Sequence, residues 1–298
     1  MSLNYKSLLI ALAAFLWATD SLLRLPLTRE LSAATIVMLE HLLAMVIVVP
    51  WLFKFWPNIK KLTARQWWGI GFVAVLASAL ATMAFTASFK YVSPSVSILL
   101  QKMQPLVTFA VASLWLRESW PRHFWRYAAI ALAGGYLISF PALIPDLRLY
   151  SNGAMGVGLA LLAAALWGSA TVVGRSLLRD LPPNFLTTMR FAVALPFLVG
   201  WWFVGGGAAA DLANLNWRDI FYVTIIMIGP GFGAMWIYYK GLSVTRASVS
   251  AILELAWPLA AVVLNWVFLQ QTLNYVQLLG GVILIFATTK LSLWSQQS

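Results

Sequence analysis

The chain has 298 residues, of which 61% are hydrophobic and 10% are charged, and its mean hydropathy is +0.83. A soluble domain is about half apolar and about one quarter charged, so this composition excludes a water-soluble globular protein and indicates a polytopic membrane protein. We assign the net charge of +11 to positively charged loops on one side of the bilayer and expect no nucleic-acid partner.

Apolar stretches of about 17–22 residues recur along the chain, and each is long enough to cross ~30 Å of hydrocarbon. Backbone groups in lipid must be paired within the segment, so we expect an all-α fold with ten transmembrane helices. The predicted spans are 7–23, 33–53, 67–87, 95–116, 124–140, 153–174, 184–204, 218–238, 247–269 and 275–292.

Lys and Arg residues predict the orientation of these spans. With the N-terminus in the cytoplasm, thirteen of them fall in cytoplasmic segments and five in external ones, while Lys102 and Arg190 lie within spans. Cytoplasmic loops are enriched in basic residues, so we expect both termini to be cytoplasmic. The expected location is the inner (plasma) membrane of the cell.

The chain repeats itself at an interval of about 150 residues. "LAAFLWAT" at 12–19 resembles "LAAALWGS" at 162–169, and "SVSILLQKMQPL" at 95–106 resembles "SVSAILELAWPL" at 248–259. Residues 1–150 and 151–298 therefore form two repeats of five helices. Because five is odd, the second repeat is inverted in the membrane relative to the first, which is a common architecture of secondary transporters.

These paired segments resemble the drug/metabolite transporter superfamily, EamA type, over nearly the whole chain. In that family the second proline segment is often followed by a Gly-Glu motif. Here the first half has Glu118 in "LRESW", whereas the second half has "LQQTL" at 269–273 without an acid. The resemblance implies efflux or exchange of small metabolites through a central cavity, and the aromatic amino acid exporters are one candidate group of relatives.

Charges within the spans are costly and mark candidate functional residues. Glu40 and Lys102 lie at one depth, Arg190 and Glu254 at another, and the repeat places Glu40 on Arg190. We therefore predict two buried ion pairs, Glu40 with Lys102 and Arg190 with Glu254. Three interpretations stay open: structural pairing, gating or binding of a zwitterionic substrate, and independent extension to the interfaces.

Prolines mark candidate hinges. Pro105 and Pro258 each remove a helical hydrogen bond, which should leave the carbonyls of Gln101 and Glu254 unpaired. The Gly229-Pro230 pair predicts a break in the eighth span, as a hinge or as a packing notch.

Aromatic and polar residues within spans predict the substrate cavity, because small-molecule pockets have apolar walls with a few polar groups. Ordinary helix packing is the alternative for each residue. The candidates are Trp17, Asp20, Glu40, Gln101, Lys102, Gln104, Trp167, Arg190, Tyr238, Glu254 and Trp257. A second set of Trp residues is predicted at the membrane interfaces, at positions 51, 56, 67, 68, 120, 125, 201, 202 and 217.

His41 and Glu40 are candidates for proton coupling, since His titrates near neutral pH. The chain has no Cys and two His, so we expect no metal, and we predict no cofactor. It also has no G-x-x-x-x-G-K-[ST] loop.

The sequence thus predicts a secondary transporter that exports or exchanges small metabolites, such as amino acids or related compounds, by alternating access. A channel and an intramembrane enzyme are the alternatives. No convincing catalytic constellation is present, so we expect no enzyme. The expected partners are a small-molecule substrate and the lipid bilayer, with protons as a candidate coupling ion, in a monomer or a homodimer.

Overall fold

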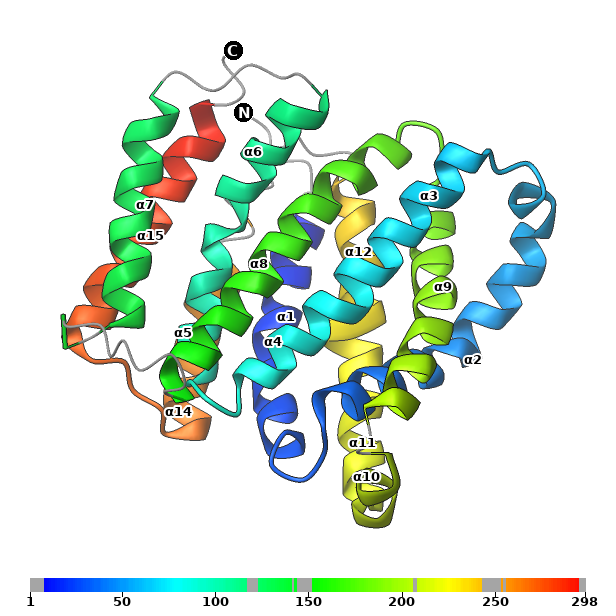
Figure 1. Ribbon diagram of the computed structural model, residues 1–298, viewed down its shortest axis with the longest axis horizontal. Coiled ribbons are helices and arrows are strands. Elements are labelled where there is room, and N and C mark those ends of the chain that lie inside the picture. The colour runs from blue at the N-terminus through cyan, green and yellow to red at the C-terminus, as the bar shows by residue number, and fades with distance from the viewer. Residues whose placement is uncertain are drawn as a thin grey trace.

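The computed structural model describes residues 8–116, 123–140, 142–143, 152–205, 208–242, 253 and 256–294, and its regular elements are all helical (Figure 1). The first half contains α1 (Leu8–Leu27), α2 (Ala33–Ile59), α3 (Ala64–Phe72), η2 (Val73–Ala81), α4 (Thr82–Ser88), α5 (Pro94–Leu100), η3 (Gln101–Met103), α6 (Gln104–Leu116) and α7 (Phe124–Ser139). The second half contains α8 (Asn152–Leu177), α9 (Pro183–Val204), α10 (Ala208–Asn214), α11 (Trp217–Ile226), η4 (Met227–Gly231), α12 (Phe232–Leu242), α14 (Ala256–Leu269) and α15 (Tyr275–Trp294).

Six helical stretches in the described part of the chain are long and apolar enough to cross a membrane. They are Leu8–Leu27, Ala33–Ile59, Ala64–Ser88, Gly153–Leu177, Pro183–Val204 and Trp217–Gly241. Ala256–Leu269 and Tyr275–Lys290 are shorter apolar helices. The chain is therefore a multi-pass membrane protein, and the full number of ten spans stays a prediction.

Polar side chains start several of the helices, because the first backbone N–H groups of a helix have no partner within it. Ser32 accepts a hydrogen bond from the Thr35 amide and caps α2. Thr63 with Gln66 forms a capping box at α3, as does Asn216 with Asp219 at α11. These short polar breaks set where each long apolar helix begins.

Corresponding helices of the two halves make corresponding contacts. Helix α2 packs on α9, and α7 packs on α15. Helix α1 packs on α12 and α14, while α8 packs on η2, α4 and α6. In Figure 1, α1 runs from the top of the view to the bottom and α8 runs from bottom to top, and α7 and α15 are likewise opposed.

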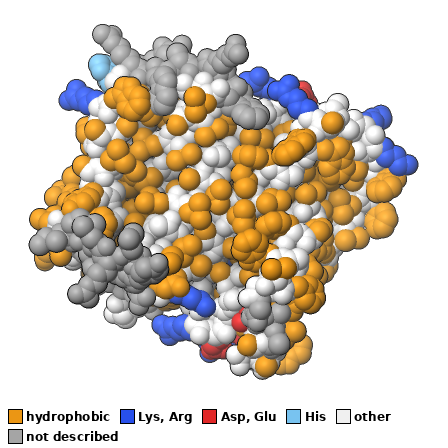
Figure 2. Space-filling model, in the orientation of Figure 1, with side chains coloured by type: hydrophobic (Ala, Val, Ile, Leu, Met, Phe, Trp, Pro, Cys, Tyr) orange, Lys and Arg blue, Asp and Glu red, His pale blue; other side chains and the backbone are white. Residues whose placement is uncertain are grey.

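The surface in Figure 2 agrees with a membrane location. Apolar side chains cover the middle of this face, and basic and acidic side chains gather toward its upper and lower margins. Of the tryptophans predicted at the interfaces, Trp68, Trp125 and Trp217 are largely exposed. Trp202, also predicted at an interface, is buried instead, and its indole N–H donates to Thr35 Oγ1 at 2.8 Å.

Two glycines bring α7 and α15 into close contact. A Cβ atom added to Gly134 would lie 2.8 Å from the carbonyl oxygen of Gly280, and one added to Gly280 would lie 2.7 Å from that of Gly134. Small residues let membrane helices approach this closely. The contact joins the last helix of one half to the last helix of the other.

We expect Gly280→Ala to lower the free energy of unfolding of the purified protein by roughly 1–3 kcal/mol, and with it the melting temperature, because the added methyl group meets backbone atoms that cannot move aside. Thermal unfolding of the detergent-solubilised protein measures this. Gly200→Ala is the matched control, since a Cβ atom at this helical position has nothing within 4 Å. Equal melting temperatures for the two variants would contradict the close contact.

Candidate functional site

An aromatic cluster joins helices from both halves. The Trp17 ring of α1 lies 5.1 Å from Tyr238 of α12 and 6.0 Å from Trp257 of α14. The Lys102 ammonium of η3 lies over the Trp257 ring, 5.0 Å from its centre. The buried Trp257 Nε1 has no hydrogen-bond acceptor. The cluster therefore combines flat apolar walls, one cation and one open N–H donor.

The repeat-related residues form a second cluster around α8. Trp167 lies 5.4 Å from the Phe85 ring, and its indole N–H donates to the Ala77 carbonyl at 2.9 Å. Gln104 donates to Thr171 Oγ1 at 3.4 Å. In the repeat Trp17 corresponds to Trp167, so both predicted aromatic positions lie at contacts between helices of the bundle.

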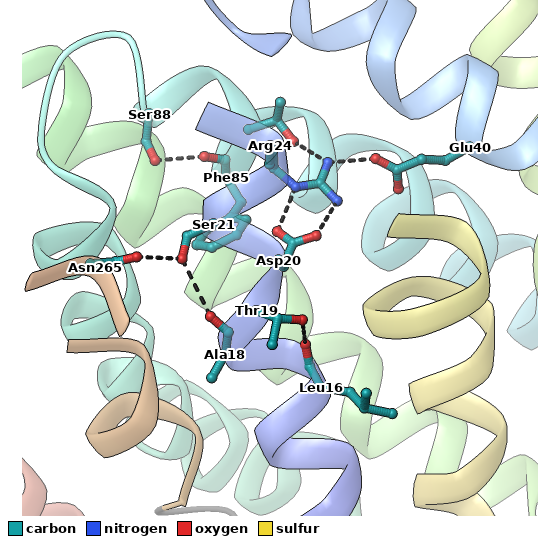
Figure 3. A network of polar contacts seen from close by, with 11 residues as sticks. Leu16, Ala18, Thr19, Asp20, Ser21, Arg24, Glu40, Phe85, Ser88 and Asn265 are labelled. Carbon is teal, nitrogen blue, oxygen red and sulfur yellow. Dashed lines mark hydrogen bonds and ion pairs between the residues drawn. The ribbon is translucent and has the colours of Figure 1, made fainter. Parts of the chain in front are cut away.

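A buried ion-pair network connects α1, α2 and α4 (Figure 3). The Arg24 guanidinium donates to both oxygens of Asp20 at 2.6 and 2.8 Å, to Glu40 Oε1 at 2.6 Å and to Thr86 Oγ1 at 2.9 Å. Arg24 is 4% exposed. One guanidinium thus holds two carboxylates, which is the geometry in which a buried arginine is well compensated.

The predicted pairing of Glu40 with Lys102 is wrong, since Glu40 pairs with Arg24. The predicted first span ended at residue 23, which placed Arg24 in a loop. Helix α1 instead continues through Pro26 to Leu27, so Arg24 stays within the helix, four residues after Asp20. Side chains at this spacing lie on one face of a helix.

Arg190 of α9 has a different environment. Its Nε donates to Ser78 of η2, and its Nη1 lies 3.9 Å from the Met235 sulfur. Among the residues that the structure describes, no carboxylate pairs with it. Its predicted partner Glu254 lies outside the described residues, so the Arg190–Glu254 pair stays a prediction.

His41 lies at the crossing of α2 and α9. Its ring stacks on Phe191, the residue that corresponds to it in the repeat, with 4.7 Å between centroids. Its Nδ1 is 2.9 Å from the Val37 carbonyl oxygen, which can only accept, so Nδ1 carries the proton. Nε2 is then an acceptor in the neutral ring, and it has no partner.

The proline in the fourth span changes the helix type. The structure has a 3-10 turn at Gln101–Met103, which ends two residues before Pro105. The Gln101 carbonyl was predicted to be unpaired, but it accepts from the Gln104 amide. The Gln101 side chain donates to the Ala160 carbonyl at 2.8 Å, and its own Oε1 has no partner. Gln101 therefore faces α8.

The other hinge candidates are Gly229, Pro230 and Pro258. Gly229 and Pro230 lie in the π-helical segment η4, and the corresponding part of the first half is the π-helix η2. π-Helical turns are rare and often occur at functional sites. Pro258 is the third described residue of α14, and residues 254–255 lie outside the described residues, so its role as a hinge stays a prediction.

The family comparison now has a structural context. Residues 5–140 and 154–293 each match the EamA-like transporter family. The chain belongs to this family. The matches cover each half separately, in agreement with the repeat, and they point to a transporter rather than an enzyme.

Individual relatives extend this similarity over the whole length. The riboflavin transporter ImpX of Fusobacterium nucleatum subsp. nucleatum is 30% identical over 96% of this chain and 97% of that protein. The uncharacterized transporter YwfM of Bacillus subtilis is 25% identical over 93% of this chain and 90% of that protein. One crystal structure covers 99% of both chains with a TM-score of 0.59 and 14% identity, which shows similarity of fold alone.

Several polar residues of the bundle were not among the site candidates from the sequence. Arg24 and Thr86 complete the ion-pair network, and Ser78 contacts Arg190. Asn265 of α14 joins Ser21 at 2.7 Å and Ser95 at 3.1 Å, which links α14 to α1 and α5. The i, i+4 spacing of Asp20 and Arg24 was the signal that could have identified the first of these.

We expect Arg24→Gln to destabilise the protein by ~3–5 kcal/mol, because it leaves the buried Glu40 and the partly buried Asp20 without a cation. Glu40→Gln should destabilise the protein less, since Arg24 keeps its hydrogen bonds to both oxygens of Asp20. Thermal unfolding of the purified variants measures both. In double-mutant cycles Glu40 should couple to Arg24 and not to Lys102. Coupling of Glu40 to Lys102 with none to Arg24 would restore the pairing predicted from sequence.

Proposed function

We propose that this protein is a secondary transporter that moves small organic metabolites by alternating access between two inverted five-helix repeats, residues 1–150 and 151–298. The observation that carries the proposal is the equivalence of contacts between the halves. Helix α1 packs on α12 and α14 as α8 packs on η2, α4 and α6, with the two helices running in opposite directions (Figure 1). In inverted-repeat transporters, each half can adopt the conformation of the other, which exchanges the open side.

The composition of the aromatic cluster favours a flat, conjugated substrate. Trp17, Tyr238 and Trp257 supply ring faces, and the Trp257 N–H and the Lys102 ammonium are hydrogen-bond donors. The similarity to a protein named as a riboflavin transporter favours a heteroaromatic ring. Amino acids or related compounds, the class predicted from the sequence, fit the same walls when they carry an aromatic side chain.

Transport by the proposed mechanism takes place in the inner (plasma) membrane with both termini in the cytoplasm, as the distribution of Lys and Arg predicts. Export and exchange are the proposed directions. Protons are the proposed coupling ion, with Glu40 as the acceptor, because Asp20 and Glu40 share a single guanidinium. The protein acts as a monomer or a homodimer and uses no cofactor.

Counterflow in proteoliposomes tests the transport proposal. We expect saturable, trans-stimulated uptake of tritiated riboflavin or tritiated L-tryptophan, because an alternating-access protein exchanges bound solute across the membrane. Trp257→Ala should reduce this uptake at least tenfold, and the exposed Trp68→Ala is the matched control. Flux that does not saturate would favour a channel. The absence of uptake for both solutes would contradict the proposed substrate class.

Proton coupling has a separate test. Glu40→Gln cannot release a proton, so it should abolish accumulation driven by a pH gradient while counterflow, which needs no net proton movement, continues. Glu30→Gln, at an exposed carboxylate, is the control. Gradient-driven accumulation by Glu40→Gln at the wild-type level would exclude Glu40 as the coupling group.

A further inference from the structure

The two buried arginines of the bundle differ in their counter-ions. Arg24 binds Asp20 and Glu40 and donates to Thr86 as well. Arg190 is 9% exposed and contacts no carboxylate among the residues that the structure describes. A charge inside a membrane span without a partner is costly and marks a functional site. Among the described residues, the environment of Arg190 therefore lacks an anion.

The contacts of Arg190 leave most of its donors available. A guanidinium has five N–H donors. Within the described part of the chain, Nε donates to Ser78, Nη1 reaches only the weakly accepting sulfur of Met235, and Nη2 makes no hydrogen bond. Nη1 and Nη2 present the planar fork that binds a carboxylate or phosphate through two parallel hydrogen bonds.

A second open polar atom lies at the same helix crossing. His41 stacks on Phe191, the residue next to Arg190, and its ring is 3% exposed. Its Nε2 is a buried acceptor with no donor. Buried polar atoms without partners are rare, and this acceptor would take an N–H or O–H donor of a bound ligand rather than its anionic group.

We propose that Arg190 binds the anionic group of the transported solute, a carboxylate or a phosphate, and that this group supplies the missing counter-ion. The proposal rests on the transport function proposed above. Ser78 holds the guanidinium through Nε, which leaves the fork of Nη1 and Nη2 for the ligand. The π-helix η2, which carries Ser78, packs against α9 and positions this contact.

Binding of matched probe pairs tests this anion subsite. We use tritiated L-tryptophan against L-tryptophanamide for a carboxylate, and flavin mononucleotide against riboflavin for a phosphate, in scintillation-proximity binding to purified protein. We expect the wild type to bind the anionic member of one pair at least about tenfold more tightly, as charge-assisted hydrogen bonds are about twice as strong as neutral ones. The pair that shows this preference identifies the anionic group.

Arg190→Gln should abolish the preference and leave the affinity for the member without the anionic group, L-tryptophanamide or riboflavin, within about twofold. Arg65→Gln, at an exposed arginine of α3, is the matched control and should keep the preference. Arg190→Lys keeps the charge but not the two parallel N–H donors, so it should weaken the binding of the anionic member alone. This second variant covers the case in which Arg190→Gln does not give a monodisperse protein.

Three results would overturn the proposal. They are a wild type with no preference in either pair, a preference that survives in Arg190→Gln, and an equal loss of both members. A fourth result would also contradict it. If Glu254 were the permanent partner of Arg190, the double variant Arg190→Gln/Glu254→Gln would bind the probes as the wild type does, with the same selectivity between the two members of each pair. Failure of the transport proposal is distinguishable, because it appears as absent counterflow in the wild type while these binding preferences persist.

Discussion

Inside a bilayer, water does not compensate polar groups, so each buried charge must find its partner within the protein or in a ligand. This constraint organises the bundle. Arg24 is compensated by Asp20, Glu40 and Thr86, which draws together α1, α2 and α4. Arg190 meets only Ser78 and Met235 in the described part of the chain. The same physical rule that makes one arginine a structural element makes the other a candidate for ligand binding.

The packing of the two halves provides the frame for these charges. Corresponding helices meet at two places, α2 with α9 and α7 with α15. At the first crossing His41 stacks on its counterpart Phe191, and at the second Gly134 contacts Gly280. Small residues make the second contact tight, whereas the first carries the polar groups, so the two crossings have different roles.

The sequence predicted the helical class, the repeat and the transporter family, because apolar length and self-similarity are properties of long segments. It failed where a few residues decide. The first span was predicted to end at residue 23, four residues before the end of α1. Arg24 was therefore assigned to a loop, and Glu40 was given the wrong partner. The depth of a residue along its helix also leaves its direction around the helix undetermined. Thus Gln101 was a candidate by its position along the predicted fourth span, but its contact with Ala160 required the packing of α5 and η3 on α8.

The two halves match the same family and differ in their buried charges, and this difference bears on direction. Glu40 and Arg190 occupy equivalent positions, yet Glu40 pairs with an arginine of its own half and Arg190 contacts only a hydroxyl and a thioether among described residues. If the halves exchange conformations, the two access states of the empty protein therefore differ in electrostatic free energy. A ligand shifts such an equilibrium by the difference in its affinity for the two states. An anion at Arg190 would act on the half whose described residues supply this arginine with no carboxylate, so solute binding and the choice of open side would be linked through a single guanidinium.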